Sequence, residues 1–235
     1  MYPELIFILV APAREENIGA AARAMKTMNI PCLRLVNPLC NPLGERARAT
    51  AHASVDILES AEVFASLEEA RSDISLLIGS AAKRRTVGED VHPVARLTGI
   101  IRDKGETVRK VGIVFGGEES GLSNVQLMQC DMLSTIPMHR KYPSLNLGQA
   151  VMVYATYLSD LTLTFSTKHK PPVAPDELPV VREKALQVLA DVGLDADDII
   201  HRRIVERLML LGKDDLNLFH SFCKYYLKKY HGRIK

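Results

Sequence analysis

Short apolar runs alternate with helical patterns over the first two thirds of the chain, and this alternation constrains the fold more than any other feature. Runs of four to six apolar residues are typical of buried strands, and they occupy Leu5–Val10, Leu33–Val36, Ile74–Ile78, Val111–Phe115 and Met132–Ile136. Apolar residues at helical spacing lie at Asn17–Met28, Leu67–Arg71, Val94–Arg102, Ser123–Gln129 and Asn146–Leu161. This alternation predicts an α/β fold with a mostly parallel sheet and helices on both faces. In such sheets, ligands bind in loops at the carboxyl ends of the strands.

The segment at 166–179 separates this domain from a smaller unit. It holds four prolines in fourteen positions, which is typical of a stiff, extended linker. We therefore expect an α/β domain over 1–165 and a small all-helical C-terminal extension over 180–235. Apolar spacing in the extension predicts three helices, at Val180–Val192, Asp197–Leu211 and Asp214–Tyr230. Asp197 and Asp214 are placed as N-caps or first-turn acids.

Composition excludes several classes of protein. Hydrophobic residues make up 47% of the 235 residues and charged residues 25%, as in ordinary soluble globular proteins. No apolar run approaches the roughly 20 residues that span a bilayer, and no basic segment precedes the first apolar run, as a secretory signal requires. The cysteines form neither a C-x-x-C pair nor a zinc spacing; they are Cys32, Cys40, Cys130 and Cys223. We therefore expect a cytoplasmic protein with reduced thiols, no bound metal and no membrane contact.

The net charge hides an asymmetry between the two parts of the chain. The whole chain carries +2, which is low for a nucleic-acid-binding protein. Residues 1–165 include 17 basic and 18 acidic residues, whereas residues 166–235 include 13 and 10. The positive excess lies in the C-terminal part, so the low total does not exclude an RNA partner.

The loop and helix at 14–25 hold the first polar cluster. Arg23 lies opposite the apolar face of this helix, one turn after the small residues Gly19 and Ala20. Because helical side chains lean toward the N-terminus, Arg23 would lie over these residues, where a phosphate could meet its guanidinium. Asn17 is placed to cap the helix. The alternative is a capped helix with a solvated arginine.

The glycine-rich loop Gly116–Gly121 follows a predicted strand and precedes a helix. It has neither the glycine spacing of a dinucleotide-binding loop nor a Walker lysine. The adjacent carboxylates of Glu118 and Glu119 would repel a polyphosphate, so a neutral or cationic ligand fits this loop better. A plain tight turn is the alternative.

The third loop, Ile136–Ala150, connects a strand to a long helix through Pro137 and Pro143. The two prolines impose an irregular path. Ser144 and Asn146 bring a hydroxyl and an amide to the start of the helix. The alternative role of Asn146 is that of an N-cap.

Together, and in this order, the three loops resemble the signature motifs of the SpoU/TrmH family in the SPOUT superfamily of RNA methyltransferases. The matching stretches are Asn17–Arg23, Phe115–Leu122, Ile136–Met138 and Ser144–Leu147. Arg23–Met28 with Leu35–Pro38, and Gly79–Thr86, resemble the TrmJ-like branch, which methylates ribose 2′-hydroxyls of tRNA. The resemblance covers residues 1 to about 165.

The resemblance implies a C-terminal trefoil knot in the α/β domain that binds S-adenosyl-L-methionine, and a homodimer with a shared site. The cofactor contacts of the family fall at Ser80, Ala81, Ala82, Gly116, Gly117, Ile136, Met138, Pro143, Ser144 and Leu145. The substrate that the resemblance implies is RNA, and we expect the target to be the anticodon loop of a tRNA.

The catalytic positions of the family fall at Asn17, Arg23, Glu118, Ser144 and Asn146. The reaction that the resemblance implies is attack of the ribose 2′-oxygen on the sulfonium methyl group. The family arginine has been cast as the general base, but a guanidinium stays protonated because its pKa is above about 12. We expect Arg23 to clamp a phosphate and stabilise the developing alkoxide, while Asn17, Ser144 and Asn146 orient the hydroxyl.

Basic residues near these loops and in the tail are candidate RNA contacts. They are Arg14, Arg23, Lys83, Arg84, Arg85, Arg140, Lys141, Lys224, Lys228 and Lys229. A solvated charged surface is the alternative for the loop residues. In the tail, Phe219, Phe222 and Tyr226 recur at helical spacing, so we expect them to pack against the preceding helices.

Three other functions compete with tRNA ribose methylation. The chain could act on rRNA, it could modify a base rather than a ribose, or it could bind RNA without catalysis. The intact set of candidate catalytic residues argues against the last. A nucleotide-hydrolysing enzyme is disfavoured, because the loops lack a Walker lysine and a metal cluster.

Overall fold

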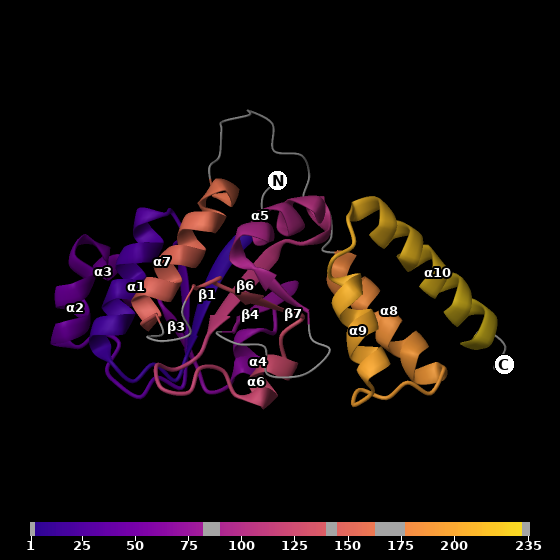
Figure 1. Cartoon of the computed structure of the whole chain (residues 1–235), viewed down its shortest axis with the longest axis horizontal. Coiled ribbons are helices and arrows are strands. Elements are labelled where there is room, and N and C mark those ends of the chain that lie inside the picture. The colour runs from indigo at the N-terminus through magenta and orange to yellow at the C-terminus, as the bar shows by residue number, and fades with distance from the viewer. Residues whose placement is uncertain (1–2, 82–89, 140–144, 163–176, 232–235) are drawn as a thin grey trace.

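The computed structural model describes residues 3–81, 90–139, 145–162 and 177–231. Its centre is a seven-stranded sheet with the order β3-β2-β1-β6-β4-β7-β5, in which every pairing is parallel (Figure 1). The strands are β1 (Glu4–Val10), β2 (Cys32–Val36), β3 (Glu62–Phe64), β4 (Leu76–Ser80), β5 (Val91–Pro93), β6 (Lys110–Phe115) and β7 (Met132–Thr135). The predicted α/β class with a parallel sheet is confirmed.

Helices cover both faces of the sheet. One face carries α1 (Glu15–Thr27), α2 (Glu45–Ala51), α3 (Val55–Glu59), α5 (Val94–Asp103) and α7 (Leu147–Leu158). The other face carries α4 (Leu67–Ala70) and α6 (Asn124–Met128). In β1, Phe7 packs into the first layer and Ile8 into the second, because successive strand residues point to opposite faces. Burial on both sides explains why this strand reads as a continuous apolar run.

The five predicted strands form, with one shifted start. The predicted strand at Ile74–Ile78 begins only at Leu76, because the Ile74 N–H closes a turn onto the Arg71 carbonyl at 2.9 Å. The three-residue strands β3 and β5 and the short helices α2 and α3 were not predicted, since such short elements carry too little periodicity. Three 3₁₀ turns complete the order: His52–Ser54, Gly105–Thr107 and Ser159–Leu161.

Strand β7 lies between β4 and β5, although it follows both in sequence. Ser134 of β7 pairs with Ser80 of β4 on one side and with His92 of β5 on the other. The segments that follow β4 and β7 therefore leave the sheet next to each other. The trefoil knot stays a prediction, because residues 82–89 lie outside the described part of the chain.

The C-terminal extension consists of α8 (Glu177–Asp191), α9 (Ile199–Leu208) and α10 (Lys213–His231), which lie beyond the β5 and β7 edge of the sheet (Figure 1). Its three predicted helices are present, but α8 begins at Glu177, so the prediction of an extended linker is wrong for residues 177–179, where Pro179 is tolerated in the first turn of the helix. Asp198, rather than Asp197, occupies the N-cap position of α9, and Asp214 lies in the first turn of α10.

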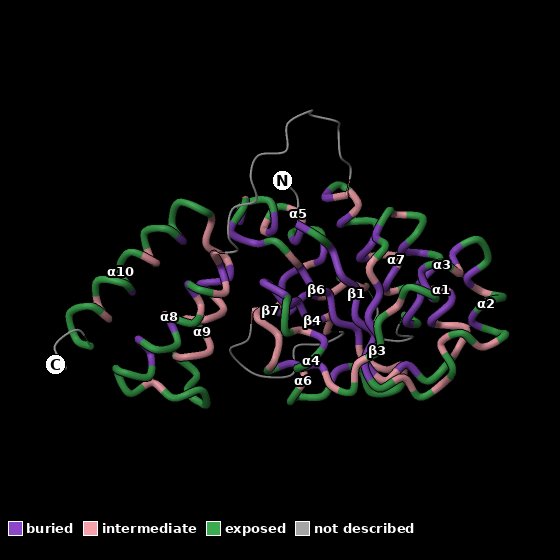
Figure 2. The backbone as a smooth tube through the Cα atoms, turned by 180° about the vertical axis from the view of Figure 1, so that it is seen from behind, coloured by how far each residue is buried: buried purple, intermediate pink, exposed green. Residues whose placement is uncertain are grey.

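The extension is packed onto the α/β domain. Its buried residues Leu178, Val181 and Leu208 belong to the same apolar core as Ile101 of α5. Figure 2 shows the strands as mostly buried and much of α10 as exposed. The domain division at 1–165 and 180–235 stays a prediction.

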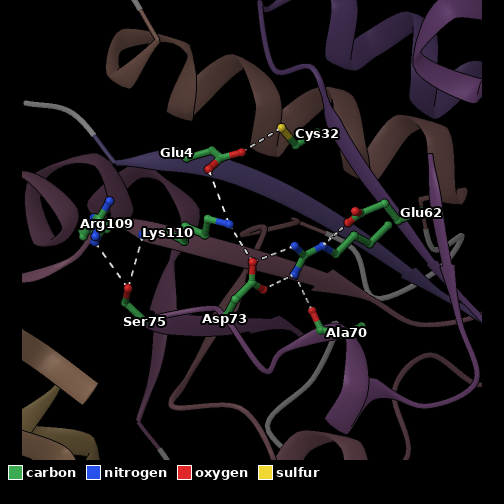
Figure 3. Close-up of polar contacts among 9 residues, drawn as sticks. Glu4, Cys32, Glu62, Ala70, Asp73, Ser75, Arg109 and Lys110 are labelled. Atoms are coloured by element: carbon green, nitrogen blue, oxygen red, sulfur yellow. Dashed lines mark hydrogen bonds and ion pairs between the residues drawn. The ribbon is translucent and has the colours of Figure 1, made fainter. Parts of the chain in front are cut away.

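An ion network centred on the buried Arg34 joins several strands near their amino ends, and its other members are partly exposed (Figure 3). Arg34 of β2, which is 8% exposed, donates two hydrogen bonds to Asp73 (2.6 and 3.0 Å), one to Glu62 (3.1 Å) and one to the Ala70 carbonyl (2.7 Å). Lys110, at the start of β6, donates to the same Asp73 carboxylate at 2.6 Å. The Arg34 guanidinium and the Lys110 ammonium hold the pKa of Asp73 far below its usual range, against the opposing effect of burial. The network lies away from the carboxyl-end loops and holds the sheet together.

Candidate active site

Two of the predicted loops meet at the carboxyl ends of the adjacent strands β1 and β6. Asn17 lies in the first turn of α1, directly after β1, and Glu118 lies in the glycine-rich loop after β6. The Glu118 carboxylate accepts hydrogen bonds from the Asn17 side-chain amide (2.8 Å) and from the backbone N–H groups of Ala13 (3.0 Å) and Arg14 (3.3 Å). The structure thus joins two candidate catalytic residues that are 101 positions apart in the sequence.

The protonation state of Glu118 follows from these contacts. Partial burial raises the pKa of its carboxyl group, but the hydrogen bonds from Asn17, Ala13 and Arg14 outweigh burial and hold the pKa below its usual value. The group is therefore ionised at neutral pH and can only accept hydrogen bonds. The NH₂ of Asn17 must then face Glu118, which leaves Asn17 Oδ1 as an acceptor with no donor among the described residues.

The predicted capping role of Asn17 is wrong. Arg14 occupies the N-cap position of α1, and no side chain caps this helix. Asn17 is the third residue of α1, within its first turn, and its amide donates to Glu118 instead.

The small residues of α1 serve close helix packing. A Cβ added to Gly19 would lie 2.0 Å from Thr50 Oγ1, and one added to Gly148 would lie 2.7 Å from the Ala20 Cβ. Gly19 and Ala20 therefore let α2 and α7 approach α1, and the space that was expected to receive a phosphate is filled by these helices.

The glycine-rich loop forms the tight turn that the sequence left as an alternative. The Gly121 N–H donates to the Gly117 carbonyl at 2.9 Å, and Gly121 has a φ of +66°. A Cβ at Gly116 would lie 2.1 Å from the carbonyl carbon of Gly121. The tight turn is compatible with a role of Glu118 in the site, because the turn places the Glu118 carboxylate next to the start of α1.

The predicted cofactor contacts lie at the carboxyl ends of three neighbouring strands, β6, β4 and β7. Ser80 ends β4, and the Ala81 N–H donates to the Ser134 carbonyl of β7 at 2.8 Å. Gly116 and Gly117 follow β6, and Ile136 and Met138 follow β7; all of these contacts are half-buried. Leu145 is exposed just before α7, whereas Ala82, Pro143 and Ser144 lie outside the described residues. The described contacts thus form one partly exposed rim.

Two buried hydroxyls that sequence reasoning missed lie next to this rim. Ser134 is 0% exposed and Tyr154 of α7 is 1% exposed. The two hydroxyls lie near each other, and neither makes a hydrogen bond that meets the usual geometric limits with any described residue. Burial raises the pKa of Tyr154, which therefore stays protonated. A single hydroxyl in an otherwise apolar strand or helix gives no sequence signal.

Asn146 caps α7. Its Oδ1 accepts from the Gln149 N–H at 2.7 Å, and Gln149 Oε1 accepts from the Asn146 N–H at 3.1 Å, which completes a capping box. The alternative reading of Asn146 is confirmed, and its NH₂ group remains available for a ligand. The contact between Gly148 and Ala20 places the amino end of α7 beside α1.

The structure does not bring Arg23 to the pair formed by Asn17 and Glu118. Six residues of α-helix advance about 9 Å along the axis and turn about 240°, so Arg23 and Asn17 lie on different faces of α1. The Arg23 side chain is exposed, and it has no ion-pair partner in the part of the chain that the structure describes.

A cavity of about 880 Å³ adjoins Asn17 and is lined by the loops that follow β1 and β2. Arg46, on its wall, is 77% exposed and forms an ion pair with Glu16 at 3.2 Å. Sequence reasoning missed Arg46 because α2, on which it lies, was not predicted.

The candidate RNA contacts are exposed wherever the structure describes them. Arg14 lies at the start of α1, and Lys224, Lys228 and Lys229 lie on α10. The other candidates, Lys83, Arg84, Arg85, Arg140 and Lys141, lie outside the described residues.

The aromatic residues of α10 pack only in part. Phe219 contacts the apolar core and Tyr226 is half-buried, but Phe222 is 54% exposed, so its predicted packing is wrong. The buried residues of this helix, Leu216 and Cys223, lie two turns apart on a narrow stripe that Phe222 only borders.

The described residues contain neither a membrane-spanning helix nor a cluster of metal-binding side chains. No described helix is both long and apolar enough to cross a membrane. The described side chains include no group of three or more His, Cys, Asp or Glu residues placed to hold a metal ion. All four cysteines are free, as expected.

Two family models match the chain. Residues 4–156 match the SpoU rRNA Methylase family, and residues 175–230 match the C-terminal domain of the tRNA/rRNA methyltransferase LasT.

Individual relatives agree with these matches. The chain is 38% identical to the uncharacterized tRNA/rRNA methyltransferase LasT of Escherichia coli, over 92% of this chain and 94% of that protein. It is 36% identical to the tRNA (cytidine/uridine-2′-O-)-methyltransferase TrmJ of Sodalis glossinidius, over 66% of this chain and 60% of that protein.

Solved structures show the same fold. TrmJ from Z. mobilis superposes with a TM-score of 0.64 at 26% identity, covering 96% of this chain and 99% of that one. The SpoU methyltransferase AviRb from Streptomyces viridochromogenes, solved in complex with AdoMet, gives a TM-score of 0.55 at 18% identity, covering 70% and 60%. The chain belongs to the SpoU methylase family of RNA methyltransferases.

Proposed function

We propose that this methyltransferase transfers a methyl group from S-adenosyl-L-methionine to a ribose 2′-hydroxyl in the anticodon loop of tRNA. The observation that carries the proposal is the hydrogen bond between Glu118 and Asn17, which leaves one oriented acceptor at the carboxyl edge of the sheet. The similarity to TrmJ, a tRNA (cytidine/uridine-2′-O-)-methyltransferase, supports the ribose and the tRNA.

The residues at the rim fit the proposed cofactor. Ser80, Ala81, Ile136 and Met138 are small or apolar, half-buried and adjacent across neighbouring strands, which suits an adenosine and a methionine chain held largely by backbone groups. The hydroxyls of Ser134 and Tyr154 are buried nearby without outside partners. AviRb, which shares the fold, was solved with AdoMet. When bound, this cofactor supplies an activated, electrophilic methyl group.

The residues of this chain then position the ribose. The fixed Oδ1 of Asn17 can accept the hydrogen bond of the 2′-hydroxyl and so orient its oxygen; because an amide oxygen is an acceptor and not a base, the hydroxyl proton passes on to solvent water as the oxygen is methylated. The NH₂ group of Asn146, at the start of α7, adds a donor to this set, and Ser144 stays a member of it by prediction from the sequence motif alone. Positioning of this kind lowers a barrier by roughly 7–11 kcal/mol in well-aligned systems.

Arg23 acts as a phosphate clamp in this proposal. A protonated guanidinium can hold a phosphate with two hydrogen bonds and stabilise the developing negative charge on the ribose oxygen. Because Arg23 and Asn17 lie on different faces of α1, the Arg23 side chain points away from the site that Asn17 forms in the same subunit. We therefore propose a homodimer in which Arg23 of one subunit serves the site of the other.

RNA contacts extend beyond the site. Arg14 at the start of α1 and the lysines of α10 are exposed and placed to meet phosphates. Lys224, Lys228 and Lys229 lie in a stretch of α10 that contains no acidic residue after Asp215. The positive C-terminal part would thus hold the RNA while the near-neutral α/β domain carries out the reaction.

Methyl transfer in vitro tests the proposal. The purified protein is incubated with S-adenosyl-L-methionine carrying a deuterated methyl group and with separate tRNA and rRNA transcripts, and the RNA is digested to nucleosides for mass spectrometry. The expected product is a 2′-O-methylated nucleoside from tRNA alone. Label on rRNA identifies the alternative substrate, label on a base refutes ribose chemistry, and tight RNA binding without label identifies an inactive RNA-binding protein.

A further inference from the structure

Among the described residues, two pairs of arginine and aspartate join the C-terminal extension to the α/β domain. Arg182 of α8 pairs with Asp131, and Arg207 of α9 pairs with Asp90. The Asp131 side chain is only 6% exposed and Arg182 is 23% exposed, so this pair is shielded from solvent. Few solvent-exposed ion pairs contribute much to the free energy of folding, whereas ion pairs shielded from solvent hold their two partners in a definite geometry.

Both carboxylates lie next to the strands that carry the cofactor rim. Asp131 immediately precedes β7, and Asp90 immediately precedes β5. Asp131 also accepts a hydrogen bond from the Leu77 N–H of β4 at 2.7 Å. Arg182 therefore acts on a group that is bonded to β4 and leads directly into β7.

The path from these pairs to the cofactor rim is short and continuous. Leu77 lies three residues before Ser80 in β4. Across the sheet, His92 of β5 pairs with Ser134 of β7, and the Ser134 carbonyl accepts the Ala81 N–H at 2.8 Å. A shift of β5 or β7 would be passed directly to Ser80 and Ala81.

The interface between the two parts is incompletely packed, which gives the ion pairs more influence. A cavity of about 860 Å³ separates α4, α6 and the start of β7 from α8 and α9. Arg71, Asp131 and Arg182 all line this cavity. Side-chain packing therefore does not fix the separation of these surfaces here, and the charged contacts hold it.

We propose that the C-terminal extension positions the cofactor rim, with Arg182 and Arg207 as positioning residues. Neither touches the rim; each acts through the strand that its carboxylate partner precedes. Because the lysines of α10 belong to the same extension, occupation of the extension by RNA and binding of the cofactor are coupled. The inference rests on the proposed function for the identity of the cofactor.

The test compares Arg182→Gln, Arg207→Gln and the control Arg203→Gln in the full-length protein. Arg203 lies on α9, the helix that also carries Arg207; its side chain is exposed and has no ion-pair partner among the described residues. The fold should survive Arg182→Gln, because Asp131 keeps its ion pair with Arg71 at 3.3 Å. Thermal unfolding checks this, and the conservative variant Arg182→Lys serves as a rescue.

Two readouts decide the inference. Calorimetric titration with S-adenosyl-L-methionine should show affinity reduced about 3- to 30-fold in Arg182→Gln, the range of coupling through such networks, reduced by a smaller factor in Arg207→Gln, whose side chain is 58% exposed, and unchanged in Arg203→Gln. Hydrogen exchange without ligand should be faster at residues 76–81 and 132–138 in the two variants. The double variant Asp90→Arg with Arg207→Asp should recover both readouts, because it restores the ion pair in reverse.

The outcomes separate this inference from the proposed function. Folded variants with unchanged affinity and unchanged exchange overturn the positioning role, as does a lower melting temperature without either effect. If the wild-type protein does not bind S-adenosyl-L-methionine, the proposed cofactor is wrong, and the exchange measurement still decides whether the extension positions these strands.

Discussion

Replacing Glu118 with glutamine removes the charge that orients Asn17 while it preserves the size of the side chain. Glu118 Oε1 accepts from Asn17 and Arg14, and its Oε2 accepts from the Ala13 N–H. Glutamine has one acceptor oxygen, so its NH₂ must face at least one of these donors. At least one charge-assisted hydrogen bond is lost, at a cost of about 1.5–3 kcal/mol, and the remaining ones become neutral and weaker.

The loss should appear mainly in catalysis. Since about 1.4 kcal/mol corresponds to tenfold in rate, a loss of about 2–3.5 kcal/mol lowers kcat roughly 30- to 300-fold. The KM for S-adenosyl-L-methionine should change less than about threefold, because the residues of the cofactor rim do not contact Glu118 through any of these hydrogen bonds.

Steady-state methylation of a tRNA transcript measures both constants, and Glu119→Gln is the matched control. Glu119 is exposed beside Glu118, so its variant should retain wild-type kcat within about twofold. A folded Glu118→Gln enzyme that keeps more than half of the wild-type kcat would refute the claim that this carboxylate orients Asn17 for the reaction.

Four further predictions concern stability and RNA binding. Arg34→Gln removes the hydrogen bonds of the buried guanidinium, but Asp73 is 43% exposed and keeps its contact with Lys110, so the free energy of unfolding, measured by urea titration, should fall by about 1.5–3 kcal/mol; a loss below about 0.5 kcal/mol would contradict a stabilising role of the Arg34 network. The pKa of Asp73 is lowered in the folded state, so its contribution is complete above the unfolded pKa of about 3.9 and is lost as pH falls below it; Asp73→Asn should remove this acid dependence. Lys104 is 0% exposed, and burial lowers its pKa from 10.5 to about 8. Between pH 8 and pH 10.5 the unfolded state therefore binds more protons than the folded state, and the free energy of unfolding should rise by up to about 3 kcal/mol over this range. The variant Lys104→Met should lack this rise. Replacing Lys228 and Lys229 with alanine should reduce the slope of log K against log salt for single-stranded RNA by about 1.4, and an unchanged slope would show that these lysines do not meet phosphates.

Sequence patterns predicted the frame of the fold because its central strands are long and buried on both faces. The runs at Leu5–Val10 and Val111–Phe115 coincide with β1 and β6 to within one residue. The edge strands β3 and β5 have three residues each, and no periodicity can be read from so short a segment. The order of the strands could not be predicted from the sequence either, because the position of β7 between β4 and β5 depends on contacts between residues far apart in the chain.

The candidate site could be predicted as a set of residues but not as a geometry. The motifs identified Asn17 and Glu118, whereas their hydrogen bond depends on the packing of two loops from separate strands. The opposite error occurred at Gly19, where a small residue was interpreted as space for a ligand. Thr50 fills that space, and it lies on a helix too short to predict from its sequence.

Mapping 2′-O-methylated nucleotides in tRNA tests the central claim most directly. Cells that lack the gene are complemented with the wild-type chain or with Asn17→Ala, and their purified tRNAs are analysed by mass spectrometry of defined fragments. The proposed function predicts that one ribose 2′-O-methyl group in the anticodon loop is lost with the gene, restored by the wild-type chain and not restored by Asn17→Ala. Unchanged ribose methylation of tRNA in cells without the gene would contradict it.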